Sequence, residues 1–218
     1  MPRLPLFPLN VVLFPGTPMP LHIFEPRYRT LLADCLEDDG RFGLIYSATS
    51  KPPPAGSIGC IAHIHGSRLL ADGGSNIVVI GESRFVVERY LDESLPYSVA
   101  TVAEIDDTDA HAVSAEQMKD LSRLGEAYLQ SLHELNDSIA TTIDFTEDPQ
   151  ELSFQLSAAL ELDPERKQRL LSTRRTTERV HQLLRLFPPL VRELADRARV
   201  HMTARGNGKS HRPYTTEP

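Results

Sequence analysis

The chain has 218 residues with a formal net charge of −7 at pH 7, and 40% of its residues are hydrophobic. This size and composition indicate a folded protein with one core or two small ones. No apolar run approaches the roughly 20 residues of a membrane-spanning helix, prolines interrupt the N-terminal apolar segment that a signal peptide would need, and two cysteines do not suggest a disulfide framework. We therefore expect a cytoplasmic protein with reduced thiols and no membrane partner.

The first 29 residues alternate short apolar runs with prolines. Each run is too short for a helix, and each proline removes a backbone donor, so the segment is expected to run extended along sheet edges. Pro15-Gly16 predicts a turn, and Glu25-Pro26 predicts the start of a helix because proline favours the first helical position. The prolines that separate these runs stand at positions 5, 8, 15, 18, 20 and 26.

Residues 26–38 are expected to form a helix, because five apolar residues fall on one face at intervals of three and four. Alternating segments follow, and Asp72-Gly73-Gly74 between two of them predicts a hairpin turn. Consecutive strands with short turns and one helix predict an α+β fold with a small antiparallel β pseudo-barrel over residues 1–109. The helical face holds Tyr28, Leu31, Leu32, Cys35 and Leu36, and strands are expected at 42–46, 57–65, 68–71, 76–81, 84–90 and 96–105.

Helical periodicity replaces strand alternation after Asp109. The last apolar stripe surrounds Pro188-Pro189, which should break or kink its helix. We expect an α-helical bundle over residues 110–202 and a disordered tail over 203–218. Earlier helix starts are predicted by the capping-box spacing of Ser114 and Gln117 and by the pairs Asp148-Pro149 and Asp163-Pro164.

The N-terminal pattern resembles the opening of the Lon protease N-terminal domain, also called the LON substrate-binding domain. A weaker similarity continues through the strands to the helical region near Leu186. The resemblance implies a PUA-like pseudo-barrel with one embedded helix, followed by a helical bundle. The family often has Asp at the start of the fourth bundle helix, where Arg175 stands here. The matching residues are Pro5, Leu6, Phe7, Pro8, Leu9, Val12, Leu13, Phe14, Pro15, Gly16, Leu21, Ile23, Phe24, Glu25, Pro26, Arg27 and Tyr28, then Gly59, Ile61, Ala62, Arg84, Phe85, Pro96 and Tyr97.

Charge is distributed unevenly, since residues 1–163 hold 10 Lys/Arg and 25 Asp/Glu whereas residues 164–218 hold 13 and 5. One interpretation is that the acidic and basic parts dock against each other. The other is that the Arg-rich segment Arg166–Arg199 forms a surface for an anionic partner such as RNA. Few aromatic residues flank these arginines, so a stacking platform is not evident and nucleic acid is the less favoured partner.

Three patterns that suggest chemistry lack residues that their motifs require. Gly208-Lys209-Ser210 resembles the end of a phosphate-binding loop, but Thr203 stands where that motif needs glycine. Cys60 and His63 point to opposite faces of a strand, and His63 with His65 supplies only two metal ligands. No serine lies in a G-x-S-x-G elbow. We expect no enzyme activity, no cofactor and no metal.

The resemblance implies a non-catalytic module that binds unfolded or extended polypeptides, with protease or quality-control components as further partners. The chain does not match the ATPase or peptidase parts of Lon. The expected site is a groove between barrel and bundle, lined by the proline-rich loop 52–54 and the segment around Phe14–Met19. An RNA-binding module and a small-molecule enzyme are the alternatives. The candidate contact residues are Phe14, Met19, Phe24 and Tyr28.

Overall fold

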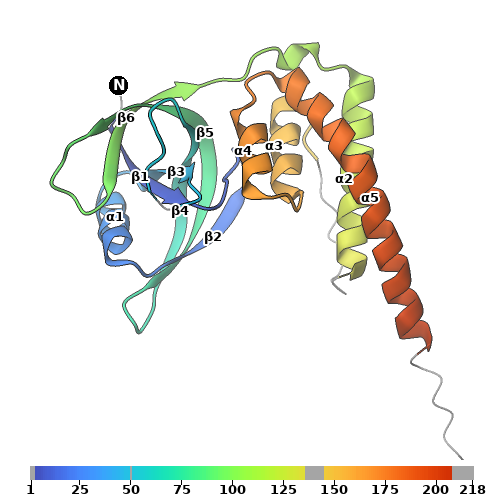
Figure 1. The fold of residues 1–218 in the computed structure, drawn as a ribbon, viewed down its shortest axis with the longest axis horizontal. Helices are drawn as coiled ribbons and strands as arrows, with labels where there is room; N and C mark the ends of the chain where they lie inside the picture. Colours follow the sequence, from blue (N-terminus) through green and yellow to red (C-terminus); the bar gives the residue numbers. More distant parts are fainter. Residues whose placement is uncertain (1–2, 50, 136–144, 208–218) are drawn as a thin grey trace, which may run out of the picture.

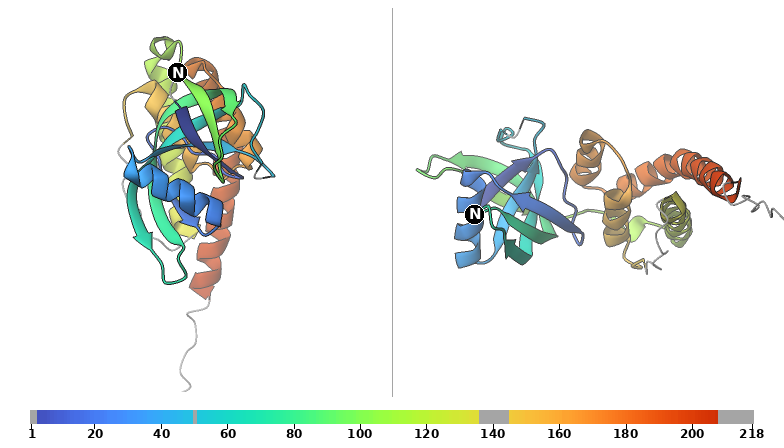
Figure 2. Two further views of the ribbon diagram at one scale, coloured as in Figure 1. Left: turned by 90° about the vertical axis from the view of Figure 1, so that its left-hand side faces the viewer. Right: turned by 90° about the horizontal axis from the view of Figure 1, so that it is seen from below.

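The computed structural model describes residues 3–49, 51–135 and 145–207, with side chains described as far as residue 200. Its two halves lie end to end, a β barrel with one helix and a group of helices (Figure 1). The long helix α5 (Thr176–Asn207) extends away from the barrel, as the view from below in Figure 2 also shows. The expected α+β class is confirmed.

Six strands form one sheet that closes on itself, in the order β2-β5-β4-β3-β1-β6 with β6 pairing back to β5. The β1–β3 pairing is parallel and the others are antiparallel, so the barrel is mixed rather than wholly antiparallel. Parallel neighbours need a crossover, and the chain between these two strands provides it. The strands are β1 (Arg3–Leu9), β2 (Pro18–Ile23), β3 (Arg41–Tyr46), β4 (Ile58–Leu69), β5 (Ser75–Leu91) and β6 (Ser98–Ile105).

Strands β4 and β5 are longer than the alternation predicts, because each joins two expected strands into one. The register shifts between Cys60 and Ala62 and again between Ile64 and Gly66. Such bulges reset which residues face the core, so a continuous strand looks like two separate patterns in the sequence. The predicted hairpin turn is confirmed: Gly73 has φ 80° and the Gly74 amide donates to Asp72 Oδ1 at 2.9 Å.

Helix α1 (Pro26–Glu37) packs on the barrel and begins with proline in its first turn, as expected. Four residues of its predicted apolar face enter the barrel core, with exposed fractions of 5% or less. The fifth, Leu36, is 52% exposed. The four buried residues are Tyr28, Leu31, Leu32 and Cys35.

The helical half contains four α-helices and one short 3₁₀ helix within its described residues. The predicted capping box is present: the Ser114 amide donates to Gln117 Oε1 at 2.9 Å, and the Gln117 amide donates to Ser114 Oγ at 3.2 Å. Asp148 and Asp163 cap the next two helices by accepting from the amides of Glu151 and Arg166. The elements are η1 (Ala110–Ala112), α2 (Ala115–Leu135), α3 (Pro149–Ala159), α4 (Pro164–Ser172) and α5.

Helix α5 runs through Pro188 and Pro189 without a break, so of the two expected effects, a break or a kink, the break does not occur. Phe187 and Leu194 on either side of the prolines are buried in the helical core, so tertiary packing holds the helix where backbone hydrogen bonds are lost. The helix ends at Asn207, beyond the boundary expected at residue 202, and residues 208–218 lie outside the described part.

The two halves share a core, although the sequence predicts a boundary near residue 109. Val12 and Phe14 from the barrel half pack among the helices, where the rings of Phe14 and Phe154 are 6.3 Å apart. Gly81 allows this segment to cross β5, because a Cβ at that position would lie 2.2 Å from the Phe14 carbonyl oxygen. The barrel therefore supplies part of the surface against which the helices fold.

A buried charge cluster also joins the halves. The Asp107 carboxylate lies between the guanidinium groups of Arg84 on β5 and Arg179 on α5, and all three side chains are at most 1% exposed. Nearby, the exposed Arg175 donates to Asp109 Oδ2 at 2.8 Å. These pairs favour the docking interpretation of the charge asymmetry for this part of the basic segment.

Candidate functional site

Exposed apolar side chains gather around the hairpin between β4 and β5. Within the described part of the chain, six large hydrophobic residues are exposed, and four of them lie on this hairpin, on α1 or beside β2. The hairpin extends from the barrel next to α1 (Figure 1). Clustered apolar exposure indicates an interaction surface more strongly than isolated residues do. The four are Phe24, Leu36, Leu69 and Val78, and the other two are Val11 and Val200.

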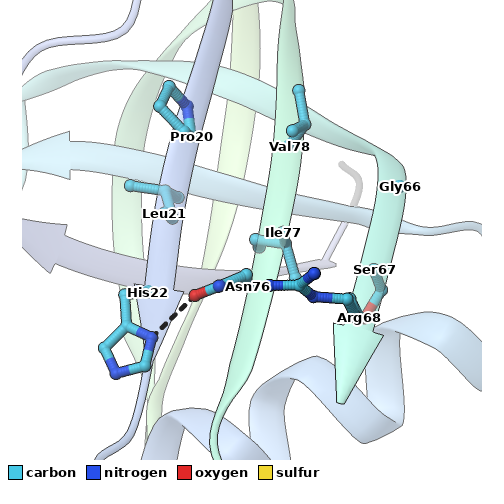
Figure 3. Close-up of a pocket in the computed structure, with 9 residues that line it drawn as sticks. All are labelled: Pro20, Leu21, His22, Gly66, Ser67, Arg68, Asn76, Ile77 and Val78. Carbon is cyan, nitrogen blue, oxygen red and sulfur yellow. Dashed lines mark hydrogen bonds between the residues drawn. The ribbon is translucent and has the colours of Figure 1, made fainter. Parts of the chain in front are cut away.

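One hollow of about 560 Å³ lies on the outer face of three neighbouring strands, β2, β5 and β4 (Figure 3). Gly66 leaves space there because it has no side chain, and Val78 is 42% exposed. A hydrogen bond between His22 Nδ1 and Asn76 Oδ1, at 2.8 Å, joins two of the strands at one end. The lining residues are Pro20, Leu21, His22, Gly66, Ser67, Arg68, Asn76, Ile77 and Val78.

Phe24 extends this outer face beyond the end of β2. Phe24 is 62% exposed, and its ring stacks on the ring of His22 with centroids 5.7 Å apart and an interplanar angle of 24°. His22 is held in turn by Asn76. An exposed aromatic side chain with a fixed neighbour is suited to packing against an apolar group of a ligand.

A second hollow of about 600 Å³ lies between α1 and the hairpin. Leu36 from the helix and Leu69 from β4 line it, and Leu69 is 75% exposed. Arg29 packs over the turn, since a Cβ at Gly73 would lie 2.6 Å from its Nη2. The full lining is Pro26, Arg29, Thr30, Leu32, Ala33, Leu36, Ser67, Leu69, Gly73 and Ser75.

The two hollows are electrostatically alike. Each is lined by one arginine, Arg68 or Arg29, and no Asp or Glu is among the described residues that line either one. This is a local reversal, because the first 163 residues carry 25 acidic and 10 basic side chains. The surface is therefore apolar with a basic margin.

The free edge of β2 offers few backbone donors. The Gly81 amide donates to the Thr17 carbonyl at 3.0 Å, so odd-numbered residues of β2 direct their backbone groups toward β5. The even-numbered residues face the open edge, and two of them are Pro18 and Pro20, which have no N–H. A peptide that adds to this edge as a further strand would lack those hydrogen bonds. The faces of the hairpin are the better contact surfaces.

The four contact residues predicted from the sequence are placed differently from one another. Phe14 is 1% and Tyr28 is 3% exposed, so both belong to cores. Met19 is partly buried against the barrel core, whereas Phe24 is exposed. The structure thus leaves Phe24 accessible beside the outer hollow, and the contact role of all four stays a prediction.

The groove expected between barrel and bundle corresponds to a hollow of about 490 Å³ between the barrel and α4. Pro53 of the proline-rich loop lines it, together with Ile58, Gln168 and Ser172. The segment that includes Phe14 does not line it, because that ring is packed among the helices. Gln168 closes part of the space by donating to the Ile58 carbonyl at 2.9 Å.

The thiols of Cys35 and Cys60 are both buried. Burial raises the pKa of Cys60, and it raises the pKa of Cys35 to about 12 with a smaller contribution from Asp39. Among the described residues, no group of three or more His, Cys, Asp or Glu side chains is arranged to hold a metal ion, and no helix is both long and apolar enough to cross a membrane. The Gly208-Lys209-Ser210 sequence lies outside the described residues.

Three exposed residues of this surface are not among the contact residues predicted from the sequence: Leu36, Leu69 and Val78. Leu36 completes a helical apolar stripe and so looks like a core residue. Leu69 stands three residues before Asp72-Gly73-Gly74, and an apolar side chain this close to a hairpin turn was the available signal. Val78 lies in an apolar run that is typical of a buried strand, so only the register of the sheet reveals that it faces outward.

Comparisons with known proteins agree with this fold. Lon protease 2 of Myxococcus xanthus is 26% identical over 192 residues, which cover 84% of this chain and 23% of that protein. Lon protease of Roseiflexus castenholzii is 30% identical over 190 residues, with 83% and 23% covered. The chain therefore spans about a quarter of the length of these curated relatives.

Two solved structures share the fold. The crystal structure of a Lon N-terminal domain protein from Xanthomonas campestris matches with a TM-score of 0.67 and 24% identity, over 86% of this chain and 100% of that one. The N-terminal domain of Mycobacterium avium complex Lon protease matches with a TM-score of 0.63 and 20% identity, over 84% and 96%. A family model described as the ATP-dependent protease La (LON) substrate-binding domain matches residues 3–187. Because that model covers most of the sequence, the chain belongs to the LON substrate-binding domain family.

Proposed function

We propose that this chain is a non-catalytic module that binds unfolded or extended polypeptides through the faces of the β4–β5 hairpin. The observation that carries the proposal is that the exposed side chains of Leu36, Leu69 and Val78 line two hollows that share Ser67. The exposed Phe24 adds to this surface by stacking on His22, which lines the outer hollow. Family membership supports it, because the matching model is described as a substrate-binding domain of an ATP-dependent protease.

Binding would depend on apolar contact rather than on strand addition. Complete burial of a leucine or valine side chain is worth about 1.5–3 kcal/mol, so several partial burials on a shallow surface give modest affinity. Pro18 and Pro20 disfavour backbone pairing at the edge of β2. A ligand segment that carries several apolar side chains along its length would place one in the outer hollow and another in the hollow beside α1.

The basic margin would make the surface select among apolar segments by the charge of their flanks. Arg29 and Arg68 are exposed, and each lines one hollow. A carboxylate next to an apolar segment would be attracted there, whereas a lysine-rich segment would be repelled. The proposed substrate class is therefore apolar segments with neutral or acidic flanks, presented in the cytoplasm by incompletely folded chains.

Catalysis and ATP are outside the proposed role. The similarity extends over 23% of the curated Lon proteases, and the family model concerns their substrate-binding part. A protease or another quality-control component would act on polypeptides bound by this module. The module itself should bind without nucleotide.

The test is titration of the purified chain, without ATP, into a fluorescently labelled disulfide protein that is kept unfolded by reduction and alkylation of its cysteines, with anisotropy as the readout. We expect saturable binding of the unfolded polypeptide in the micromolar range and no such binding of its folded form. Equal binding of folded and unfolded forms, or no binding across a broad peptide panel, would overturn the proposal. Turnover of the polypeptide by the isolated chain would overturn its non-catalytic part.

A further inference from the structure

A groove on the helical half differs from the hairpin surface in both position and charge. It lies between α4 and α5 and has a volume of about 250 Å³. Three of its six lining residues are arginines, and none of the described residues that line it is acidic. The lining consists of Arg166, Arg169, Leu170, Gln182, Arg185 and Leu186.

The two helices present the same spacing to this groove. On α4 the groove is lined by Arg166 and, three and four positions later, by Arg169 and Leu170. On α5 it is lined by Gln182 and, again three and four positions later, by Arg185 and Leu186. Residues three and four apart lie on one helical face, so the groove has matching charged and apolar positions on both walls. The pairs are Arg169-Leu170 and Arg185-Leu186.

The positive charge in the groove is incompletely neutralised. Arg166 lies 3.4 Å from Asp163, and both side chains are 54% exposed. Arg169 and Arg185 are exposed, and among the described residues no carboxylate lies within ion-pair distance of either guanidinium. Other arginines of the same segment are engaged, since Arg175 pairs with Asp109 and Arg179 with Asp107.

We propose that the α4–α5 groove is a second binding site that takes an acidic, leucine-containing segment of a protein partner. A carboxylate would bind between Arg169 and Arg185, because guanidinium groups form paired, charge-assisted hydrogen bonds with carboxylates. Apolar side chains next to that carboxylate would pack on Leu186, which is partly exposed, whereas Leu170 is buried. RNA is the less suitable occupant, because none of the described residues that line the groove has an aromatic side chain to stack on a base.

The site is independent of the hairpin surface. The groove belongs wholly to the helical half, whereas both hollows around the hairpin belong to the barrel and α1. An acidic segment held in the groove would leave the apolar surface open. The chain would then be able to attach to one partner while it binds a polypeptide elsewhere.

The experiment uses fluorescence anisotropy with two short labelled peptides of alternating residues, one of glutamate and leucine and one of glutamine and leucine. The Arg169→Gln/Arg185→Gln double variant is compared with Arg123→Gln, which changes an arginine on α2 that is also exposed. Circular dichroism melting should be unchanged in both variants, since all three side chains are exposed.

We expect the wild-type chain to bind the glutamate peptide tightly. The double variant should bind it at least about tenfold more weakly, and Arg123→Gln should bind it like the wild type. The affinity should also fall as salt is raised. Equal binding of the two peptides, equal loss in the control variant, or no binding would overturn the inference. Preferential binding of a short uridine RNA, lost in the double variant, would overturn the choice of a protein partner.

Discussion

Asp107 and Arg179 form an ion pair in which both side chains are fully buried, although they stand 72 positions apart in the sequence. Arg84 binds the other carboxylate oxygen, and Thr176 Oγ1 donates to Asp107 Oδ2 at 2.6 Å. Burial lowers the pKa of both arginines, and the carboxylate opposes that shift. The Phe154 ring covers the Arg179 guanidinium at 3.9 Å. Barrel, connecting segment and α5 therefore meet at one charged group.

Replacing Asp107 with asparagine should destabilise the fold by about 3–5 kcal/mol, because two buried guanidinium groups then lack a counter-charge. The free energy of unfolding in urea measures this effect. Asp163→Asn is the matched control: its ion pair is exposed, and asparagine retains the capping of α4, so the change should be about 1 kcal/mol or less. Similar losses in the two variants would show that the buried cluster is not what joins the halves.

Asp109 should make stability depend on pH in the acidic range. The Arg175 guanidinium and the Thr177 hydroxyl and amide hold the pKa of the Asp109 carboxyl at about 2 in the folded chain. The unfolded value is about 3.9, so the pair stabilises the fold above that pH and the effect is lost as the pH falls toward 2. The urea midpoint of Asp109→Asn should therefore lie below that of the wild type at pH ~5 and approach it at pH ~3. A constant gap between the midpoints would contradict this assignment.

Neither thiol should react in the folded chain. Cys35 and Cys60 are buried, and burial raises the pKa of both groups, so the reactive thiolate is scarce at neutral pH. Ellman's reagent should detect both thiols only after the chain is unfolded in denaturant. Rapid reaction of either cysteine under native conditions would mean that the core opens locally around it.

The prolines of β2 should protect the sheet edge from self-association. Threonine at positions 18 and 20 would restore two backbone donors that face the open edge. The Pro18→Thr/Pro20→Thr variant should form dimers or larger species as its concentration rises, and sedimentation analysis measures this. Pro54→Thr, in an exposed loop, is the control and should remain like the wild type. A double variant with unchanged mass at every concentration would show that the edge is protected by other means.

Local signals in the sequence predicted where helices and turns begin better than how far each helix or strand continues. The capping residues Ser114 and Asp148 and the turn at Gly73 were correctly placed, because each depends on a few neighbouring residues. The continuity of β4 was not predictable, since bulges hide it from a period-two pattern. The passage of α5 through Pro188 depends on tertiary packing, which local propensity does not contain.

The candidate site was harder to predict, because exposure depends on neighbours that are distant in the sequence. Tyr28 and Leu36 belong to the same helical stripe, yet one is 3% and the other 52% exposed. The difference arises at the end of α1, where Leu36 lies beside the hairpin rather than under the barrel wall. Phe14 looked accessible in a proline-rich segment but packs on Phe154 of the helical half.

The most direct test of the account is the affinity of an unfolded, labelled polypeptide for the Leu36→Ser/Leu69→Ser variant. These side chains are 52% and 75% exposed, so the fold should be retained while the apolar surface is lost. Val200→Ser, which removes a 70% exposed side chain from α5, is the control. The account predicts binding weaker by about tenfold or more in the double variant and unchanged in the control. Wild-type affinity in the double variant would contradict it.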